Sequence, residues 1–205
     1  MKGILFKPEM IKAIREDRKT VTRRKIDIDP LGWVFKGMPY GIAAFDHKGT
    51  GERITMRPRY QVGETVYIKE TLFRHPYLNE AGYILDGTPV FINQTIGDCL
   101  KWRWTRDILS AMFMPKEAAR YFITITGVEA KRLQDLTEED AQAEGATRPP
   151  NYSLTPHYRE WFKWLWDSIN AKRVTTTGDM GTITGEGYPW ETNPWVFVYS
   201  FIREG

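Results

Sequence analysis

The segment that most constrains the fold is NPWVFVYSFI, residues 193–202, near the end of the 205-residue chain. A strand with one face in water alternates apolar and polar side chains, but this segment is apolar on both faces. Such a strand lies in the middle of a sheet or in a closed barrel. The fold must therefore enclose residues 193–202.

The other elements are predicted from side-chain periodicity and from start and stop signals. In chain order they are a helix from residue 8 to about 17, strands over 20–26 and 65–71, a strand within 119–133, a short helix over 136–145 and a longer helix over 156–170. Strands that do not alternate regularly with helices favour the α+β class, and here predict a compact barrel.

The two later helices have the clearest signals. Thr137 can cap the short helix, Asp140 completes a capping-box pattern, and Gly145 can end the helix. The longer helix is amphipathic. Its predicted apolar face consists of Tyr158, Trp161, Phe162, Leu165 and Ile169.

The length predicts a single domain over residues 1–205 that carries insertions. The insertions are expected near residues 27–60, 72–116 and 146–192. The first is rich in Gly and Pro and lacks a strong period, so we interpret it as an elaborated loop that can contain a short hairpin.

Charge is distributed unevenly along the chain. Residues 1–25 carry nine Lys/Arg and three Asp/Glu, a net charge of +6, whereas the remainder carries 20 Lys/Arg and 23 Asp/Glu. A basic block on a nearly neutral body fits a nucleic-acid or nucleotide partner, but it also fits a solvated basic face.

The sequence gives no sign of a metal, a cofactor or a membrane segment. The chain has one cysteine, Cys99, and its three histidines lack zinc-site spacing. Cys99 is interpreted as a small core residue rather than a nucleophile. The N-terminal apolar run is too short for a signal peptide, and no stretch is long enough to span a bilayer. We therefore expect a cytoplasmic protein with no metal and no cofactor.

The stretch DRKTVTRRKI, residues 17–26, concentrates the candidate chemistry. In a strand, Thr22 and Arg24 project one way and Arg23 projects the other, while Lys19 at the strand's start can bend over Thr22. A lysine whose pKa is lowered by burial or by neighbouring cations can activate a hydroxyl nucleophile. Arg18, Arg23 and Arg24 are candidate neighbouring cations and candidate phosphate or base ligands. Most Lys-x-x-Thr patterns in proteins, however, have a structural role or lie exposed on the surface.

Two carboxylates complete the candidate set. Glu70 lies in an otherwise apolar strand, where an inward-facing acid needs a partner. Glu144 lies near the end of the short helix. Either side chain could orient an amine or act as an acid in acyl transfer, although a solvated helix end also explains Glu144.

Four blocks in this order resemble the ASCH domain, a member of the PUA-like β-barrel superfamily. They are DRKTVTRR, VGETVYIKET, RLQDLTEEDAQAEG and NPWVFVYSFI. The resemblance to the minimal domain covers roughly residues 5–26, 60–72, 117–146 and 193–204. The longer form, with the helix WFKWLWDSIN, is similar to ASCH-type proteins of phages and prophages. The implied fold is a PUA-like mixed β-barrel with flanking helices and long insertions.

The resemblance also implies a function. PUA-like barrels are associated with RNA or modified bases, which implies a basic cleft for a nucleoside or nucleobase. One ASCH branch consists of amidohydrolases that remove the acetyl group of N4-acetylcytidine. Carried onto this chain, that motif makes Lys19, Thr22 and Glu144 the catalytic residues and matches Arg24 to a basic position. Substrate contacts are expected from Arg18, Arg23, Arg24 and Glu70.

The chain departs from the enzyme motif at one site position. Arg23 stands where the enzymes have an aliphatic residue, and this chain is longer than they are. The same residues can therefore form a non-catalytic nucleic-acid-binding site. A ribonuclease, which also occurs among ASCH proteins, and a phage protein that interacts with its host are the further alternatives.

Overall fold

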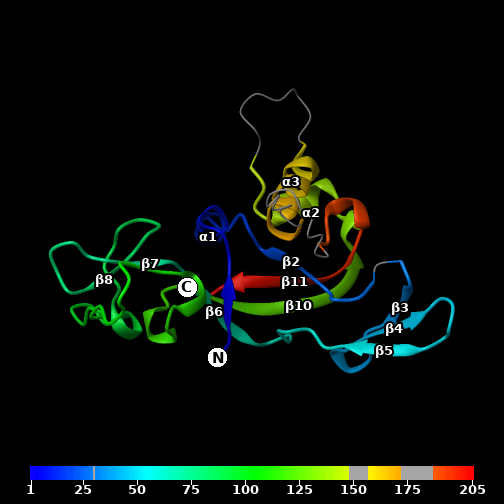
Figure 1. Ribbon diagram of the computed structural model, residues 1–205, viewed down its shortest axis with the longest axis horizontal. Coiled ribbons are helices and arrows are strands. Elements are labelled where there is room, and N and C mark those ends of the chain that lie inside the picture. The colour runs from blue at the N-terminus through cyan, green and yellow to red at the C-terminus, as the bar shows by residue number, and fades with distance from the viewer. Residues whose placement is uncertain (30, 148–156, 172–186) are drawn as a thin grey trace, which may run out of the picture. The chain divides into compact units, whose positions relative to one another are not determined.

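A computed structural model describes residues 1–29, 31–147, 157–171 and 187–205, and it confirms a mixed α+β class in which strands outnumber helices. The helices are α1 (Pro8–Arg15), α2 (Glu138–Ala143) and α3 (Tyr158–Asn170). The strands are β1 (Gly3–Leu5), β2 (Val21–Lys25), β3 (Trp33–Gly37), β4 (Ala43–His47), β5 (Arg53–Met56), β6 (Thr65–Lys69), β7 (Leu72–Arg74), β8 (Ala81–Tyr83), β9 (Ile108–Leu109), β10 (Phe122–Arg132) and β11 (Trp195–Arg203) (Figure 1).

Five strands are hydrogen-bonded in the order β1-β6-β10-β11-β2. β1 runs parallel to β6, while the β6–β10 and β11–β2 pairs are antiparallel. β11 thus has a neighbour on each side, and Val196, Phe197, Val198 and Tyr199 are all buried. This confirms the interior strand predicted at residues 193–202. In the described residues no pairing joins β1 to β2, so the barrel remains a prediction.

Contacts divide the chain into two compact units. Unit 1 comprises residues 1–17, 62–126 and 201–205, and unit 2 comprises residues 18–61 and 127–200. Strands β10 and β11 contribute residues to both units. The single domain over 1–205 stays a prediction.

Unit 1 has a hydrophobic core of its own, and residues of the predicted insertion at 72–116 form most of it. A small antiparallel sheet, β8-β7-β9, forms there. Its apolar side chains pack into one buried cluster that includes Leu72, Tyr83, Val90, Leu100 and Trp102. The insertion is therefore a folded part of unit 1.

Unit 2 shows that the loop interpretation of residues 27–60 was wrong in its extent. The segment forms a three-stranded antiparallel sheet, β3-β4-β5, rather than a loop with a short hairpin. Phe45 is fully buried there, with its ring 5.6 Å from that of Phe35 and 5.3 Å from that of Trp195. Burial of Phe45 against these aromatic rings stabilises the sheet, and the pattern of neighbouring residues in the sequence does not reveal such contacts.

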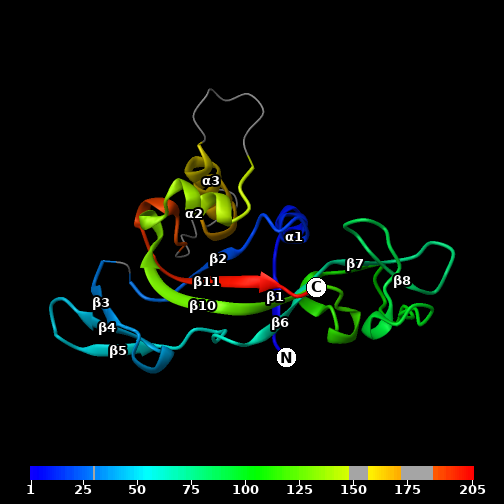
Figure 2. The same ribbon diagram turned by 180° about the vertical axis from the view of Figure 1, so that it is seen from behind.

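Helices α2 and α3 of unit 2 lie side by side in both views (Figures 1 and 2). α3 buries Phe162, Leu165 and Trp166, but Ile169, predicted on the apolar face, is 55% exposed. Trp166 is buried in place of Ile169, and its indole donates a 2.7 Å hydrogen bond to the carbonyl of Tyr188. Residues 148–156 and 172–186 of the predicted insertion near 146–192 lie outside the described residues.

Among the described residues, no helix has both the length and the apolar character needed to cross a membrane.

Candidate functional site

The chain entering β2 is held against the end of α2. The Thr20 amide donates to the Ala143 carbonyl at 2.9 Å, and Lys19 and Glu144 form an isolated antiparallel bridge. Two residues that are 125 positions apart in the sequence are thereby placed opposite each other. All residues of this contact belong to unit 2.

The ends of α2 decide where Glu144 lies. The Thr137 hydroxyl accepts a 3.1 Å hydrogen bond from the Asp140 amide, and the Asp140 carboxylate accepts from the Thr137 amide, so the predicted capping box is confirmed. The helix stops at Glu144, and Gly145 follows with φ of 90°, a conformation that favours glycine. Glu144 is thus a buried C-cap residue, not a solvated helix end.

Lys19 is buried, and its amine has three close acceptors. Nζ lies 2.6 Å from Glu144 Oε2, 2.8 Å from the Glu144 carbonyl and 2.7 Å from the Val21 carbonyl. An ammonium has three N–H donors, whereas a neutral lysine amine has two. The geometry therefore corresponds to a charged Lys19 in the resting protein.

The proton on Lys19 is nevertheless held less tightly than on an exposed lysine. Burial lowers the Lys19 pKa, and the nearby charges of Arg24 and Arg23 lower it further, while the Glu144 carboxylate opposes them. This balance is typical of lysines that serve in acid–base chemistry, although structural ion pairs also produce it.

Arg23 binds the protein's own carboxylates. Its Nη1 lies 3.2 Å from Glu144 Oε1 and its Nη2 lies 2.7 Å from Asp140 Oδ2, while the guanidinium faces the Phe162 ring at 5.9 Å. Its Nε is buried without a hydrogen-bond partner among the described residues. Asp140, which the sequence marked only as a capping residue, is therefore also a partner of the cluster.

Thr22 lies on the other face of β2. It is buried and pairs directly with Tyr199 on β11, while Arg24 pairs with Phe197. Arg24 shares the face of Thr22 by strand alternation. Arg24 is half-buried, with its Nε atom buried. Desolvation lowers the Arg24 pKa, while the nearby Tyr60, Glu144 and Tyr199 groups oppose this shift.

Arg18, another predicted substrate contact, lies at the end of α2. Arg18 Nη1 donates to the Gly145 carbonyl at 3.4 Å, beside the cluster. Sequence reasoning missed Tyr199, which pairs with Thr22, and it missed Tyr60 and Arg59, which contact Tyr199. Tyr199 Oη accepts a 3.1 Å hydrogen bond from the Arg59 amide, and burial raises the Tyr199 pKa to about 12.

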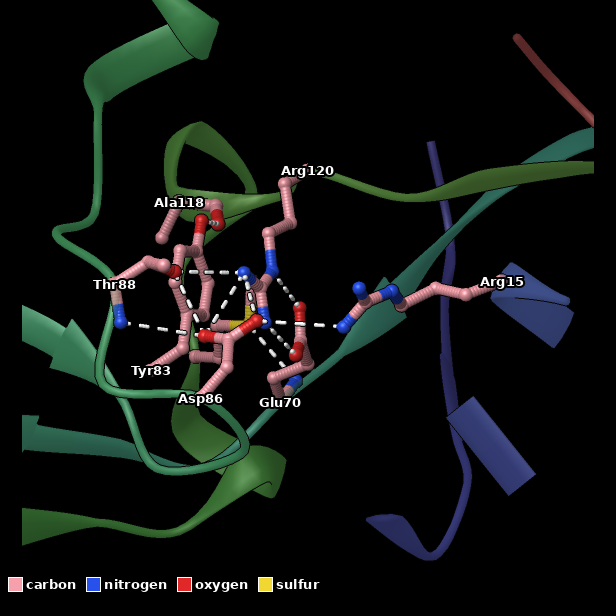
Figure 3. A network of polar contacts seen from close by, with 8 residues as sticks. Arg15, Glu70, Tyr83, Asp86, Thr88, Ala118 and Arg120 are labelled. Carbon is pink, nitrogen blue, oxygen red and sulfur yellow. Dashed lines mark hydrogen bonds and ion pairs between the residues drawn. The ribbon is translucent and has the colours of Figure 1, made fainter. Parts of the chain in front are cut away.

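Glu70 has its partners in unit 1, where Arg120 binds its carboxylate through two hydrogen bonds of 2.7 and 2.8 Å (Figure 3). The same guanidinium contacts Asp86 at 2.9 Å and lies 3.7 Å from the centre of the Tyr83 ring. The expectation that an acid in this strand needs a partner is confirmed. Glu70 belongs to unit 1, whereas Lys19 and Glu144 belong to unit 2, and the substrate role of Glu70 stays a prediction.

No group of His, Cys, Asp and Glu in the described residues has an arrangement that could hold a metal ion. Cys99 is half-buried, and burial together with the Glu80 carboxylate raises the pKa of its thiol. A raised pKa leaves less of the nucleophilic thiolate at neutral pH.

No family model, curated protein or solved structure matched this chain.

Proposed function

We propose that this chain is an ASCH-type protein with a PUA-like fold that hydrolyses the exocyclic amide of an acylated cytosine, as in N4-acetylcytidine. The observation that supports this proposal is the buried 2.6 Å contact between Lys19 Nζ and Glu144 Oε2. The resemblance assigns catalytic roles to these same two residues. Thr22, the third residue of the motif, is buried in the strand that Lys19 precedes.

In the proposed reaction Thr22 is the nucleophile and Lys19 is its base. Neutral Lys19 takes the hydroxyl proton of Thr22, and Oγ1 attacks the acyl carbon. Arg24 or a backbone N–H stabilises the oxyanion. When the carbon–nitrogen bond breaks, Lys19 returns the proton to the departing amine. Water then hydrolyses the acyl-threonine ester and releases the acid.

Glu144 orients Lys19 in this scheme. Its carboxylate and its carbonyl both accept hydrogen bonds from Nζ, which fixes the amine in position. Desolvation, which lowers the Lys19 pKa, increases the fraction of neutral amine available at a given pH.

Incubation with N4-acetylcytidine tests the reaction. We expect release of cytidine and acetate by the wild-type protein, and a loss of roughly 100-fold or more in the Thr22→Ala variant because the nucleophile is removed. Absence of turnover in the wild type, or full turnover in the variant, would contradict the proposal.

A second candidate is a non-catalytic binder of nucleic acid or of a modified nucleoside. It is favoured by the three hydrogen-bond acceptors around the Lys19 ammonium, because a lysine that keeps its proton cannot act as a base. This candidate predicts salt-dependent binding of RNA or DNA without product formation, weakened by Arg24→Ala. Binding that is insensitive to salt counts against it.

A further inference from the structure

We propose that Arg23 is a positioning residue of the Lys19–Glu144 site: it binds the second oxygen of the Glu144 carboxylate and shares the negative charge that would otherwise act on Lys19 alone. Arg23 does not contact the reacting atoms in the proposed reaction. For its effect on catalysis the inference rests on the proposed function, whereas its effect on Lys19 can be measured in the protein without substrate.

The two oxygens of the Glu144 carboxylate have different cationic partners. Oε2 lies 2.6 Å from Lys19 Nζ, and Oε1 lies 3.2 Å from Arg23 Nη1. A carboxylate bound at one oxygen alone can rotate and exchange its oxygens, whereas one bound at both is held in a single orientation. Arg23 thus helps to fix the position from which Glu144 accepts the Lys19 hydrogen bond.

The guanidinium of Arg23 is anchored at a second point. Its Nη2 lies 2.7 Å from Asp140 Oδ2, and Asp140 is the residue that closes the capping box of α2. Asp140 and Glu144 are four positions apart, so they lie on one side of the helix, where like charges repel. The planar fork of an arginine can bind both carboxylates at once, whereas the ammonium of a lysine is a single point charge.

Burial makes the charge of Arg23 effective on its neighbours. The side chains of Arg23 and Glu144 are 1% and 3% exposed, so salt screens them little. Desolvation lowers the Lys19 pKa most, the Glu144 carboxylate raises it, and the charges of Arg24 and Arg23 lower it further. Loss of Arg23 therefore removes a repelling charge and leaves more of the Glu144 charge on Lys19. Both changes hold the Lys19 proton more tightly.

Stability alone does not account for an arginine at this position. The Arg23 Nε is buried without a hydrogen-bond partner in the described part of the chain, and an unpaired buried donor costs free energy. A buried ion network also adds little net stability compared with apolar side chains of the same size. The guanidinium faces the Phe162 ring at 5.9 Å, a contact that an apolar side chain could also make. What the arginine adds is a fixed charge directed at Glu144.

Wild type and three variants separate the charge of Arg23 from its packing. Arg23→Met removes the charge, and Arg23→Lys keeps the charge but not the planar fork. Arg53→Met is the matched control, because Arg53 binds Asp46 through two hydrogen bonds in the same unit but is exposed. Thermal unfolding at each pH verifies that the variants are folded, and Arg23→Gln, which also removes the charge, replaces Arg23→Met if that variant does not fold.

The first measurement follows the protonation of Lys19 without substrate. In protein labelled with carbon-13 in its lysine side chains, the chemical shift of Lys19 Cε reports the protonation of the amine, and the signal is assigned by its absence in Lys19→Met. We expect the midpoint of this titration to lie at higher pH in Arg23→Met than in wild type, and to return toward wild type in Arg23→Lys. Equal midpoints in wild type and Arg23→Met would overturn the inference, with or without turnover of any substrate.

The second measurement follows kcat/KM for N4-acetylcytidine across pH. The proposed reaction needs neutral Lys19, so kcat/KM should rise as the pH rises through the Lys19 pKa. Because a charge within about 4–6 Å changes the protonation equilibrium of its neighbour by roughly ten-fold or more, Arg23→Met should lose at least about ten-fold near neutral pH and approach wild type at high pH. Arg53→Met should follow the wild-type profile.

A loss by the same factor at every pH indicates a structural effect alone and contradicts the positioning role. If wild type does not turn over N4-acetylcytidine while the Lys19 midpoint still moves in Arg23→Met, the proposed function is wrong and the effect of Arg23 on Lys19 stands.

Discussion

Lys19 is subject to opposing influences that determine its protonation. Burial and two arginines favour the neutral amine, while Glu144 and two carbonyl acceptors favour the ammonium. The protein thus holds a charged lysine whose proton can be removed more easily than that of an exposed lysine. Lys19 can act as a base only in the fraction of molecules in which it has lost this proton.

The lowered Lys19 pKa predicts a pH dependence of stability. The pKa in the unfolded chain is near the ordinary value of 10.5, and in the folded protein it is lower. Between these two values the unfolded state binds more protons, so the free energy of unfolding rises with pH. Urea unfolding of wild type and Lys19→Met across this interval should show wild type gaining stability relative to the variant. An unchanged difference would contradict the lowered pKa.

Glu144→Gln should reduce both stability and turnover. Breaking a buried ion pair costs roughly 3–5 kcal/mol of unfolding free energy, because Lys19 loses its carboxylate partner while Arg23 keeps only Asp140. Chemical denaturation measures this loss, and N4-acetylcytidine turnover should fall by roughly 100-fold. Glu129→Gln is the matched control, since Glu129 is exposed and bonds only a surface lysine in the described residues. Equal effects of the two variants would exclude a special role for Glu144.

At the scale of elements, α2 positions the site although it is only six residues long. Its capping box fixes the start, Gly145 ends it, and the bridge from Glu144 to Lys19 joins it to β2. The same Asp140 that closes the capping box binds Arg23. The residues that begin and end α2 therefore also supply the carboxylates that bind Arg23 and Lys19.

Thr137→Ala tests this coupling. Loss of an N-cap hydroxyl costs about 1 kcal/mol of unfolding free energy. Because Asp140 and Glu144 are displaced with the helix, we also expect turnover to fall. Thr137→Ser keeps the capping oxygen and should retain both properties. If Thr137→Ala loses stability but keeps full turnover, α2 does not position the site.

Prediction from sequence succeeded where the determining interaction is local. The caps of α2 and the interior position of β11 follow from a few neighbouring residues. The sheet β3-β4-β5 could not be predicted, because Phe45 is buried against Trp195, 150 positions later in the chain. For the same reason the residue patterns named Lys19 and Glu144 separately, and only the family resemblance assigned them to one site. Sequence reasoning also missed Arg59, whose backbone N–H donates a hydrogen bond to Tyr199.

At the scale of the whole molecule, each of the two compact units contains a charged cluster. The cluster of unit 1 centres on Arg120, which bonds Glu70, Asp86 and the Thr88 hydroxyl (Figure 3). It joins Glu70, the residue after strand β6, to Asp86 of the folded insertion. Every partner in this cluster is satisfied by another residue of unit 1, as expected of a structural network.

The Glu70→Gln variant tests whether Glu70 stabilises the fold or contacts the substrate. We expect a loss of roughly 3–5 kcal/mol of unfolding free energy, since Arg120 loses its buried partner. Calorimetry with a cytosine ligand should show unchanged affinity at a temperature where the variant is folded. A large loss of affinity with no loss of stability would instead support the substrate contact that the sequence suggested for Glu70.

In the proposed function, Lys19, Thr22 and Glu144 form one site for a cytosine base. A crystal structure of the wild-type protein with cytidine, the product of the proposed reaction, tests whether they do. We expect the exocyclic amine within about 3.2 Å of the Thr22 hydroxyl, with Lys19 and Glu144 still in contact beside it. Cytidine bound away from Thr22, or a protein that remains empty at saturating cytidine, would contradict the claim.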